Sequence, residues 1–267
     1  MLDLKQLTGD VCRIATEAGH FLKEERKNFR RESVVEKHAH DYVSYVDKES
    51  EKQIVAELSV LLPEAGFITE EGSAVYQDEP YCWVIDPLDG TTNYIHDEAP
   101  YCVCIALRSR TELLLGVVYE VCRDECFCAW RGGRAFMNGE EIHVSGGRDI
   151  KDAFVFAELP YNAQQYKQTA LHLIDKLYGV VGGIRMNGSA AAAICYVAMG
   201  RFDAWAEAFL GKWDYSAAAL IVQEAGGKVT NFYDEEKFIE GHHIIATNRT
   251  LHSFFQKLLA EVPPLNM

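Results

Sequence analysis

The chain has 267 residues, of which 48% are hydrophobic and 25% charged, as in an ordinary folded globular protein. Its 40 acidic residues outnumber its 26 basic residues, which gives a formal net charge of −14. Nucleic acids and anionic membranes attract positive charge, so this balance excludes them as general direct partners. Small phosphorylated substrates remain open, because a cation can neutralise their charge.

The sequence also predicts the cellular location of the protein. The sequence has no apolar run near the about 20 residues of a membrane span, and its start does not resemble a signal peptide. Eight cysteines in a chain of this length favour reduced thiols over a disulfide framework. We therefore expect a cytoplasmic protein.

The first half of the sequence predicts two helices followed by strands. Apolar residues from Leu4 to Leu22 recur at helical spacing and predict a helix over about 3–25. A polar, charged stretch over 26–40 follows, and a second helix is expected from Asp47, as its N-cap, to Pro63. Apolar segments between turns predict strands at 67–68, 83–85, 103–107, 113–119 and 126–130. Asn138-Gly139 predicts a tight turn.

The second half mixes the two element types. Strands are expected at 154–156, 203–207 and 244–246, and helices at 164–178, 190–199, 215–225 and 251–259. This order predicts a layered α/β or α+β fold, with a seam near 140–150. We expect one domain over 1–267 with two sublobes, at about 1–145 and 146–267.

The segment most informative about chemistry covers residues 83–93 and reads WVIDPLDGTTN. An apolar strand leads into two carboxylates three residues apart, Asp86 and Asp89, and Gly90 permits a sharp turn after them. Carboxylate oxygens are the ligands that Mg²⁺ prefers, and the amides at a helix N-terminus favour phosphate oxygens. Spacing alone leaves two interpretations open, a metal–phosphate site and a surface turn rich in Asp and Gly.

Two further acidic segments bear on this choice. Glu70-Glu71 follows a short strand, and Asp214 stands at the start of a helix. Taken separately, the pair would be solvated loop carboxylates and Asp214 a helix cap.

Together, these segments carry a family resemblance. DPLDGTTN at 86–93 resembles the first motif of the inositol monophosphatase family, and WDYSAA at 213–218 with EAGG at 224–227 resembles the second. Glu70-Glu71 occupies the family's glutamate position, and further matches include DYVS at 41–44, GVVY at 116–119 and GSAA at 188–191. The resemblance covers nearly the whole chain.

The resemblance implies a layered α-β-α-β-α sandwich with a metal site between two sublobes. It also implies Mg²⁺-dependent, lithium-sensitive hydrolysis of a phosphate monoester on a small polyol, with myo-inositol 1-phosphate as the expected substrate, and a homodimer. Without metal, the converging carboxylates would repel one another, so we expect Mg²⁺ to raise the melting temperature.

The same resemblance assigns roles to single residues. Two or three Mg²⁺ ions would be held by Glu70, Asp86, Asp89, Asp214 and the backbone carbonyl of Ile85. The catalytic residues would be Asp47 and Thr91, which orient and deprotonate the attacking water, together with Glu70. The amides of Gly90 and Thr91 would hold the phosphate. The polyol would contact Asp89, Gly188, Ser189, Ala190 and Glu207, with Glu207 accepting hydroxyl protons.

Several alternatives stay open. Lys37 is expected either in a loop over the active site, in contact with a metal-bound water, or in a plain surface loop. Glu71 could share the role of Glu70. Cys122, Cys126 and Cys128 are expected to be buried apolar side chains, because their spacing is not a usual zinc pattern.

The motifs indicate the metal chemistry, but they do not identify the alcohol that carries the phosphate in the substrate. Phosphoadenosine phosphatases more often have TKE after the Gly that corresponds to Gly90, and fructose-1,6-bisphosphatases usually have SSN, so TTN at 91–93 disfavours both. Fructose 1,6-bisphosphate stays an alternative, because some members of the resembling family accept both substrates. Histidinol phosphatase is not separated by these motifs. A regulatory or protein-binding role on the same fold is the alternative of a different class.

Overall fold

The computed structural model describes residues 2–30, 32, 34–38, 41–147, 149–161, 163–233 and 238–261. The helices are α1 (Leu4–Arg26), α2 (Tyr45–Leu61), α3 (Thr91–His96), α4 (Ala163–Leu177), α5 (Ala190–Ala198), α6 (Lys212–Glu224) and α7 (His252–Ala260). The strands are β1 (Val35–His38), β2 (Asp41–Val43), β3 (Ala65–Thr69), β4 (Tyr81–Asp89), β5 (Cys102–Ser109), β6 (Leu113–Glu120), β7 (Glu125–Trp130), β8 (Ala135–Met137), β9 (Glu140–Ile142), β10 (Phe154–Ala157), β11 (Gly183–Arg185), β12 (Ala204–Ala208), β13 (Lys228–Thr230) and β14 (His243–Thr247). A short 3-10 helix lies at Ile150–Asp152.

These strands form two large sheets and one small hairpin. The first sheet has the order β3-β4-β5-β6-β7-β8-β9; β3 and β4 are parallel, and each later pair is antiparallel. The second has the order β11-β10-β12-β14-β13 and mixes parallel and antiparallel pairs. The chain passes from the first sheet to the second between β9 and β10, close to the expected seam.

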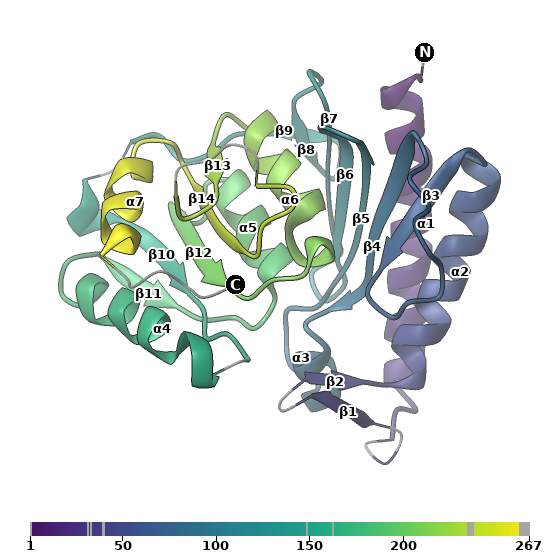
Figure 1. The fold of residues 1–267 in the computed structure, drawn as a ribbon, viewed down its shortest axis with the longest axis horizontal. Helices are drawn as coiled ribbons and strands as arrows, with labels where there is room; N and C mark the ends of the chain where they lie inside the picture. Colours follow the sequence, from purple (N-terminus) through teal and green to yellow (C-terminus); the bar gives the residue numbers. More distant parts are fainter. Residues whose placement is uncertain are drawn as a thin grey trace.

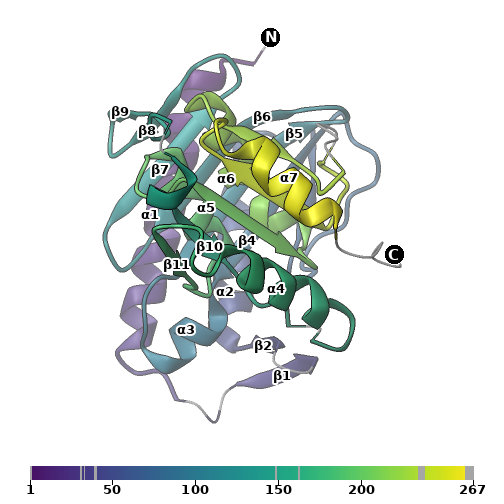
Figure 2. The same ribbon diagram turned by 90° about the vertical axis from the view of Figure 1, so that its left-hand side faces the viewer.

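Helices and sheets alternate in five layers, which confirms the α-β-α-β-α sandwich (Figures 1 and 2). Helices α1 and α2 cover the outer face of the first sheet. The apolar helices α5 and α6 lie between the two sheets and share one core with both. Helices α4 and α7 cover the outer face of the second sheet.

Burial follows the residue pattern of each layer. In α1, apolar side chains spaced three or four residues apart are buried, from Leu7 through Val11 and Ile14 to Leu22. In α5, which has a sheet on either side, all nine residues are buried. The sequence AAAAICYVA therefore has no polar face.

The hydrophobic periodicities predict most elements within a few residues, and three details differ. The second helix begins at Tyr45 with Ser44 as N-cap, because Asp47 is the third helical residue and closes a capping box with Ser44. The polar stretch contains the β1–β2 hairpin, with register Val35↔Val43. The short strands β8, β9, β11 and β13 were not expected. The Asn138-Gly139 turn is confirmed: it joins β8 to β9 with both φ angles positive.

The cysteines are free, as expected, but their burial differs from the prediction. Cys102 and Cys104 are buried, as the strand pattern suggests. Cys122 is exposed, and Cys126 and Cys128 are partly exposed, so the expectation of buried side chains is wrong for these three. The described helices also fall short of the length and apolarity that a membrane span requires.

Candidate active site

The two aspartates at the end of β4 point into the same cavity because the strand is irregular there. In a regular strand, side chains three positions apart face opposite sides of the sheet. Here Asp86 pairs with Cys104 and Asp89 with Cys102, so two residues of β4 lie opposite one residue of β5. This bulge brings both carboxylates to one side. Pro87, which has no backbone N–H to donate, lies within it.

Both carboxylates are held by hydrogen bonds from nearby groups. The Leu88 amide donates to Asp86 Oδ1 at 2.9 Å. Asp89 Oδ2 accepts from the Ser189 hydroxyl and, at 2.9 Å, from the Ala191 amide. Ser189 is the N-cap of α5. The second aspartate is therefore fixed to the helix layer between the sheets.

Gly90 makes the turn from β4 into α3. Its φ is +90°, and a Cβ atom there would lie 2.9 Å from the carbonyl oxygen of Pro100. Only glycine suits this left-handed, closely approached position. The turn places Thr91 at the start of α3, where its hydroxyl lies 3.0 Å from the Leu88 carbonyl oxygen.

Thr91 also contacts Asp47, another of the expected catalytic residues. The Thr91 Oγ1 atom lies 3.2 Å from Asp47 Oδ1. Asp47 is fully buried, and its Oδ2 accepts from the Ser44 amide at 2.9 Å and the Ser44 hydroxyl at 2.7 Å. Burial raises the pKa of Asp47, and these hydrogen bonds oppose the rise. Asp47 thus lies behind Thr91 and positions its hydroxyl.

Lys37 is placed by the β1–β2 hairpin against the glutamate pair. Its Nζ atom lies 3.3 Å from Glu70 Oε1 and 2.5 Å from Glu71 Oε1. Glu71 turns toward Lys37, and its amide donates to Glu51 Oε2 at 2.8 Å. Of the two glutamates, Glu70 lines the cavity.

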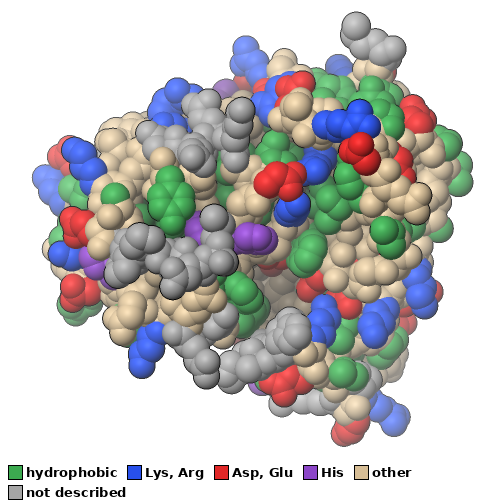
Figure 3. Space-filling model, viewed as in Figure 1, with side chains coloured by type: hydrophobic (Ala, Val, Ile, Leu, Met, Phe, Trp, Pro, Cys, Tyr) green, Lys and Arg blue, Asp and Glu red, His purple; other side chains and the backbone are tan. Residues whose placement is uncertain are grey.

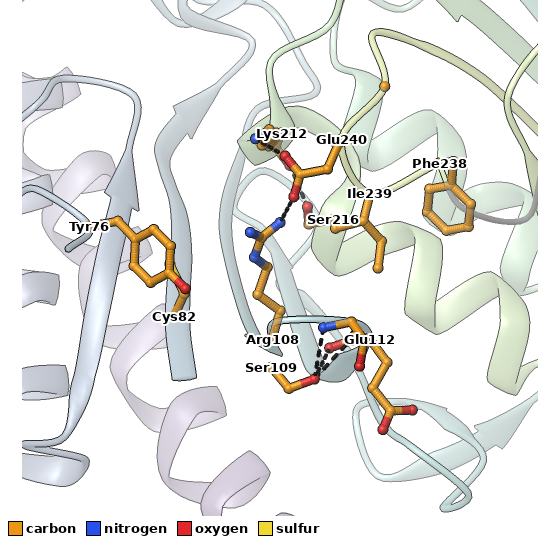
Figure 4. A network of polar contacts seen from close by, with 12 residues as sticks. Tyr76, Cys82, Arg108, Ser109, Glu112, Lys212, Ser216, Phe238, Ile239 and Glu240 are labelled. Atoms are coloured by element: carbon orange, nitrogen blue, oxygen red, sulfur yellow. Dashed lines mark hydrogen bonds and ion pairs between the residues drawn. The ribbon is translucent and has the colours of Figure 1, made fainter. Parts of the chain in front are cut away.

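The second sheet supplies the opposite wall of the cavity. Glu207 lies near the end of β12, and Asp214 in the first turn of α6, where its Oδ2 accepts from the Gly211 amide at 2.7 Å. The start of α6 is also tied to the first sheet: Glu240 binds both Arg108 in β5 and Lys212 at the helix start (Figure 4). Figure 3 shows this face of the molecule hollowed near its middle.

The cavity has a volume of about 140 Å³. Its lining includes these predicted residues: Glu70, Asp86, Asp89, Gly90, Thr91, Gly188, Ser189, Ala190, Glu207 and Asp214. It also includes residues that the sequence analysis missed: Tyr42, Leu88, Thr92, Glu158, Leu159, Tyr161, Phe209 and Leu210. Glu158 directly follows an apolar strand, as Glu70 does, and that shared position is a signal that could have found it.

Ile85, expected to contribute its backbone carbonyl, does not line the cavity. Its carbonyl oxygen accepts the Glu70 amide at 3.2 Å, as part of the pairing between β3 and β4, and the residue is fully buried. The β4 bulge instead brings Leu88 to the cavity. Leu88, and not Ile85, therefore lines the cavity, and its carbonyl oxygen accepts the Thr91 hydroxyl.

The carboxyl groups perturb one another because they share a buried volume. Burial, opposed by Lys37, raises the pKa of Glu70 to about 7. Burial and then Glu70 raise the pKa of Asp86 well above its usual range. Burial raises the pKa of Asp89 to about 6, and burial with Glu158 raises that of Glu207 strongly. The site therefore carries more negative charge than it can hold ionised without a counter-charge.

The donor set suits a hard cation, although the side chains as placed bind one another. Glu70 hydrogen-bonds to Asp86. Among the described residues, no group of three or more His, Cys, Asp or Glu side chains is arranged to hold a metal ion as it stands. Oxygen donors with raised pKa values fit Mg²⁺, which binds few carboxylates and keeps several waters. Its binding would supply the positive charge that these neighbouring carboxyl groups lack.

Comparison with known proteins agrees with this geometry. The family model described as the inositol monophosphatase family matches residues 3–263. The chain belongs to this family. A relative from Mesorhizobium japonicum named inositol-1-monophosphatase is 34% identical over 90% of this chain and 91% of its own length. A relative from Pseudomonas aeruginosa named Nus factor SuhB is 38% identical over 95% of this chain and 94% of its own length.

Solved structures of family members share the fold. The extragenic suppressor protein suhB from Bartonella henselae superposes with a TM-score of 0.88 at 34% identity, over 96% of this chain and 98% of its own. The inositol monophosphatase from Anabaena has a TM-score of 0.87 at 30% identity, over 99% of each chain. Membership supports a phosphatase activity for this inositol monophosphatase family protein.

Proposed function

We propose that this protein is a Mg²⁺-dependent phosphoric monoester hydrolase whose substrate is a small polyol phosphate, myo-inositol 1-phosphate. The observation that carries the proposal is the meeting of Glu70, Asp86, Asp89 and Asp214 in one cavity. That cavity also contains the starts of α3 and α5. A phosphate monoester is a dianion, so it cannot enter this acidic cavity unless cations accompany it.

Each wall of the cavity has a distinct task in this proposal. Glu70, Asp86, Asp89, Asp214 and the Leu88 carbonyl would hold two or three Mg²⁺ ions, which lower the pKa of bound water and neutralise the leaving oxygen. The amides of Gly90 and Thr91 would hold the phosphate. Asp47 would accept a hydrogen bond from the Thr91 hydroxyl, which would direct the oxygen lone pairs of Thr91 toward a water molecule that attacks the phosphorus.

The polyol would lie toward the second sheet. Glu207 and Ser189 line that side of the cavity with Gly188 and Ala190. A carboxylate accepts hydrogen bonds from vicinal hydroxyl groups, so Glu207 would select for a polyhydroxylated alcohol. Replacing Glu207 by alanine should change the preference among substrates more than the Mg²⁺ requirement.

The test is phosphate release from inositol 1-phosphate, fructose 1,6-bisphosphate, histidinol phosphate and phosphoadenosine phosphate, with and without Mg²⁺ and millimolar lithium. We expect phosphate release that requires Mg²⁺, is inhibited by lithium and is fastest with inositol 1-phosphate. If another substrate is hydrolysed fastest, the proposed substrate is wrong, but the proposed metal mechanism is unaffected. Asp89→Asn should abolish turnover, whereas the matched exposed control Asp78→Asn, remote from the cavity, should keep it. Near-wild-type kcat in Asp89→Asn at saturating Mg²⁺ would refute the site.

A second candidate function is regulatory, because several relatives are named Nus factor SuhB. A regulatory role would use the protein surface and would survive Asp89→Asn, which removes a cavity charge. Binding of partner proteins by the Asp89→Asn variant therefore separates the two functions.

We also propose a cytoplasmic homodimer. The eight free cysteines support a reducing compartment. The dimer is proposed from the family resemblance alone, and light scattering after size-exclusion chromatography tests it.

A further inference from the structure

Two cysteines of one strand meet a third cysteine, distant from them in sequence, on the outer face of the first sheet. Cys12 lies in α1, and Cys126 and Cys128 lie in β7. The Cys12 thiol is within hydrogen-bonding contact of both the Cys126 and the Cys128 thiols. The sequence separates residues 12 and 126 by 114 positions, so only the packing of α1 on the sheet brings them together.

The alternation of β7 explains this placement. Phe127 and Ala129 face the buried layer that contains α5 and α6. Cys126 and Cys128 therefore face the opposite side, where α1 packs. Cys126 and Cys128 share this face because they are two positions apart, and Cys12 lies opposite them.

The three thiols are accessible to small molecules. All three are partly exposed and line the same surface hollow. The other cysteines differ: Cys82, Cys102, Cys104 and Cys195 are buried, and Cys122 is exposed but contacts Tyr101 and Glu120 in place of another thiol. The cluster formed by Cys12, Cys126 and Cys128 therefore differs from the other cysteines, because its thiols are both partly exposed to solvent and close to one another.

We propose that Cys12, Cys126 and Cys128 form a thiol modification site at which a peroxide produces a disulfide between Cys12 and one of the β7 cysteines. This inference is independent of the phosphatase proposal, because the cluster contributes nothing to the acidic cavity. The disulfide would join α1 covalently to the sheet that it covers.

The reaction takes place in two balanced steps. A β7 thiolate attacks a peroxide oxygen, which forms a sulfenic acid and releases hydroxide. The Cys12 thiol then attacks the sulfenic sulfur, so that a disulfide forms and water leaves. Overall, two thiols and one hydrogen peroxide give one disulfide and two waters; sulfur is oxidised and the peroxide is reduced.

The hydrogen bonds favour this division of roles. The bond from Cys12 lowers the pKa of the Cys128 thiol against the effect of its burial. Its bonds to Cys126 and Cys128 raise the pKa of Cys12. These directions suit Cys128 to attack the peroxide and Cys12 to act as the resolving thiol.

The test uses the full chain treated with a small excess of hydrogen peroxide, followed by blocking of free thiols and digestion with trypsin. Cleavage after lysine and arginine releases Cys12 in QLTGDVCR (6–13) and both β7 cysteines in DECFCAWR (124–131). The expected product is these two peptides joined, lighter by about 2 Da than their sum. Dithiothreitol should separate them.

Matched variants identify the partners. Cys122→Ser should leave the joined product unchanged, because Cys122 lies on a separate tryptic peptide (111–123). Cys12→Ser should abolish it and leave a sulfenic acid on peptide 124–131 that dimedone traps. A wild-type chain that oxidises at Cys122 or forms intermolecular disulfides, with peptides 6–13 and 124–131 unjoined, would overturn the proposal.

Discussion

Replacing Glu240 by glutamine measures how much the fold depends on a charged partner for Arg108. The Arg108 side chain is 8% exposed, and its Nη1 lies 2.5 Å from Glu240 Oε1. Its Nε is buried and finds no hydrogen-bond partner among the described residues. Glu240→Gln keeps the size and an acceptor oxygen but removes the charge, so the guanidinium remains buried without a charged partner at this position.

The expected loss lies between two limits. Breaking a fully buried ion pair costs about 3–5 kcal/mol, whereas an exposed pair contributes about 0–1 kcal/mol. The Glu240 side chain is 60% exposed, so solvent screens it, and the glutamine oxygen still accepts a hydrogen bond. We therefore expect a loss of about 1–2 kcal/mol, which lowers the Tm of a chain of this size by about 2–8 °C.

The pH dependence supplies an internal check. Burial alone would raise the pKa of Glu240, but Lys212 and Arg108 lower it. A carboxyl group whose pKa is lower in the folded than in the unfolded state stabilises the fold at pH values above its unfolded-state pKa. This stabilisation is lost as the pH falls through the folded-state pKa. The difference in the free energy of unfolding between wild type and Glu240→Gln should therefore have its full size at pH 7 and become smaller at acidic pH.

Urea unfolding followed by circular dichroism measures the effect. Glu112→Gln is the matched control, because Glu112 is 56% exposed and lies 3.8 Å from its partner Arg131; its effect should stay within about 0.5 kcal/mol. A cycle with Arg108→Met should show that Glu240→Gln costs little once the guanidinium is gone. Equal unfolding midpoints for wild type and Glu240→Gln at pH 7 would refute the reasoning.

Three further predictions concern stability. Gly116→Ala should cost about 1–3 kcal/mol in urea unfolding, since a Cβ there would lie 2.4 Å from the Ala217 carbonyl oxygen in α6; an unchanged midpoint would contradict this packing. Burial lowers the pKa of His243, so the free energy of unfolding should fall as the pH drops below the unfolded-state pKa of about 6.5. In the His243→Phe variant, the difference between the free energies of unfolding at pH 5 and pH 7 should be smaller than in wild type. Mg²⁺ at about 100 times its Kd should add about 2.7 kcal/mol by mass action; differential scanning fluorimetry should show a raised Tm for wild type and a smaller rise for Asp89→Asn.

The sequence predicts the local part of the site well. The strand, turn and helix around Asp86, Asp89 and Gly90 depend on neighbouring residues, so the segment at 83–93 contains the information that forms them. The order of motifs also identifies the family and therefore the five layers. These features follow from spacing along the chain.

Features that depend on pairing between distant segments could not be predicted in the same way. The bulge that brings Leu88 rather than Ile85 to the cavity arises from the register of β4 against β5. Glu158 reaches the site because β10 and β12 are neighbours in the second sheet. Lys37 meets Glu70 only after the β1–β2 hairpin forms.

The apolar helix α5 limits the motions available to the molecule. All nine of its residues are buried, and its core is continuous with both sheets. Rotating one sheet away from the other would expose this helix to water at a cost proportional to its apolar area. A hinge between two halves is therefore excluded as a route for substrate entry. Surface segments such as the β1–β2 hairpin lie outside this central layer, so displacing them would leave it buried.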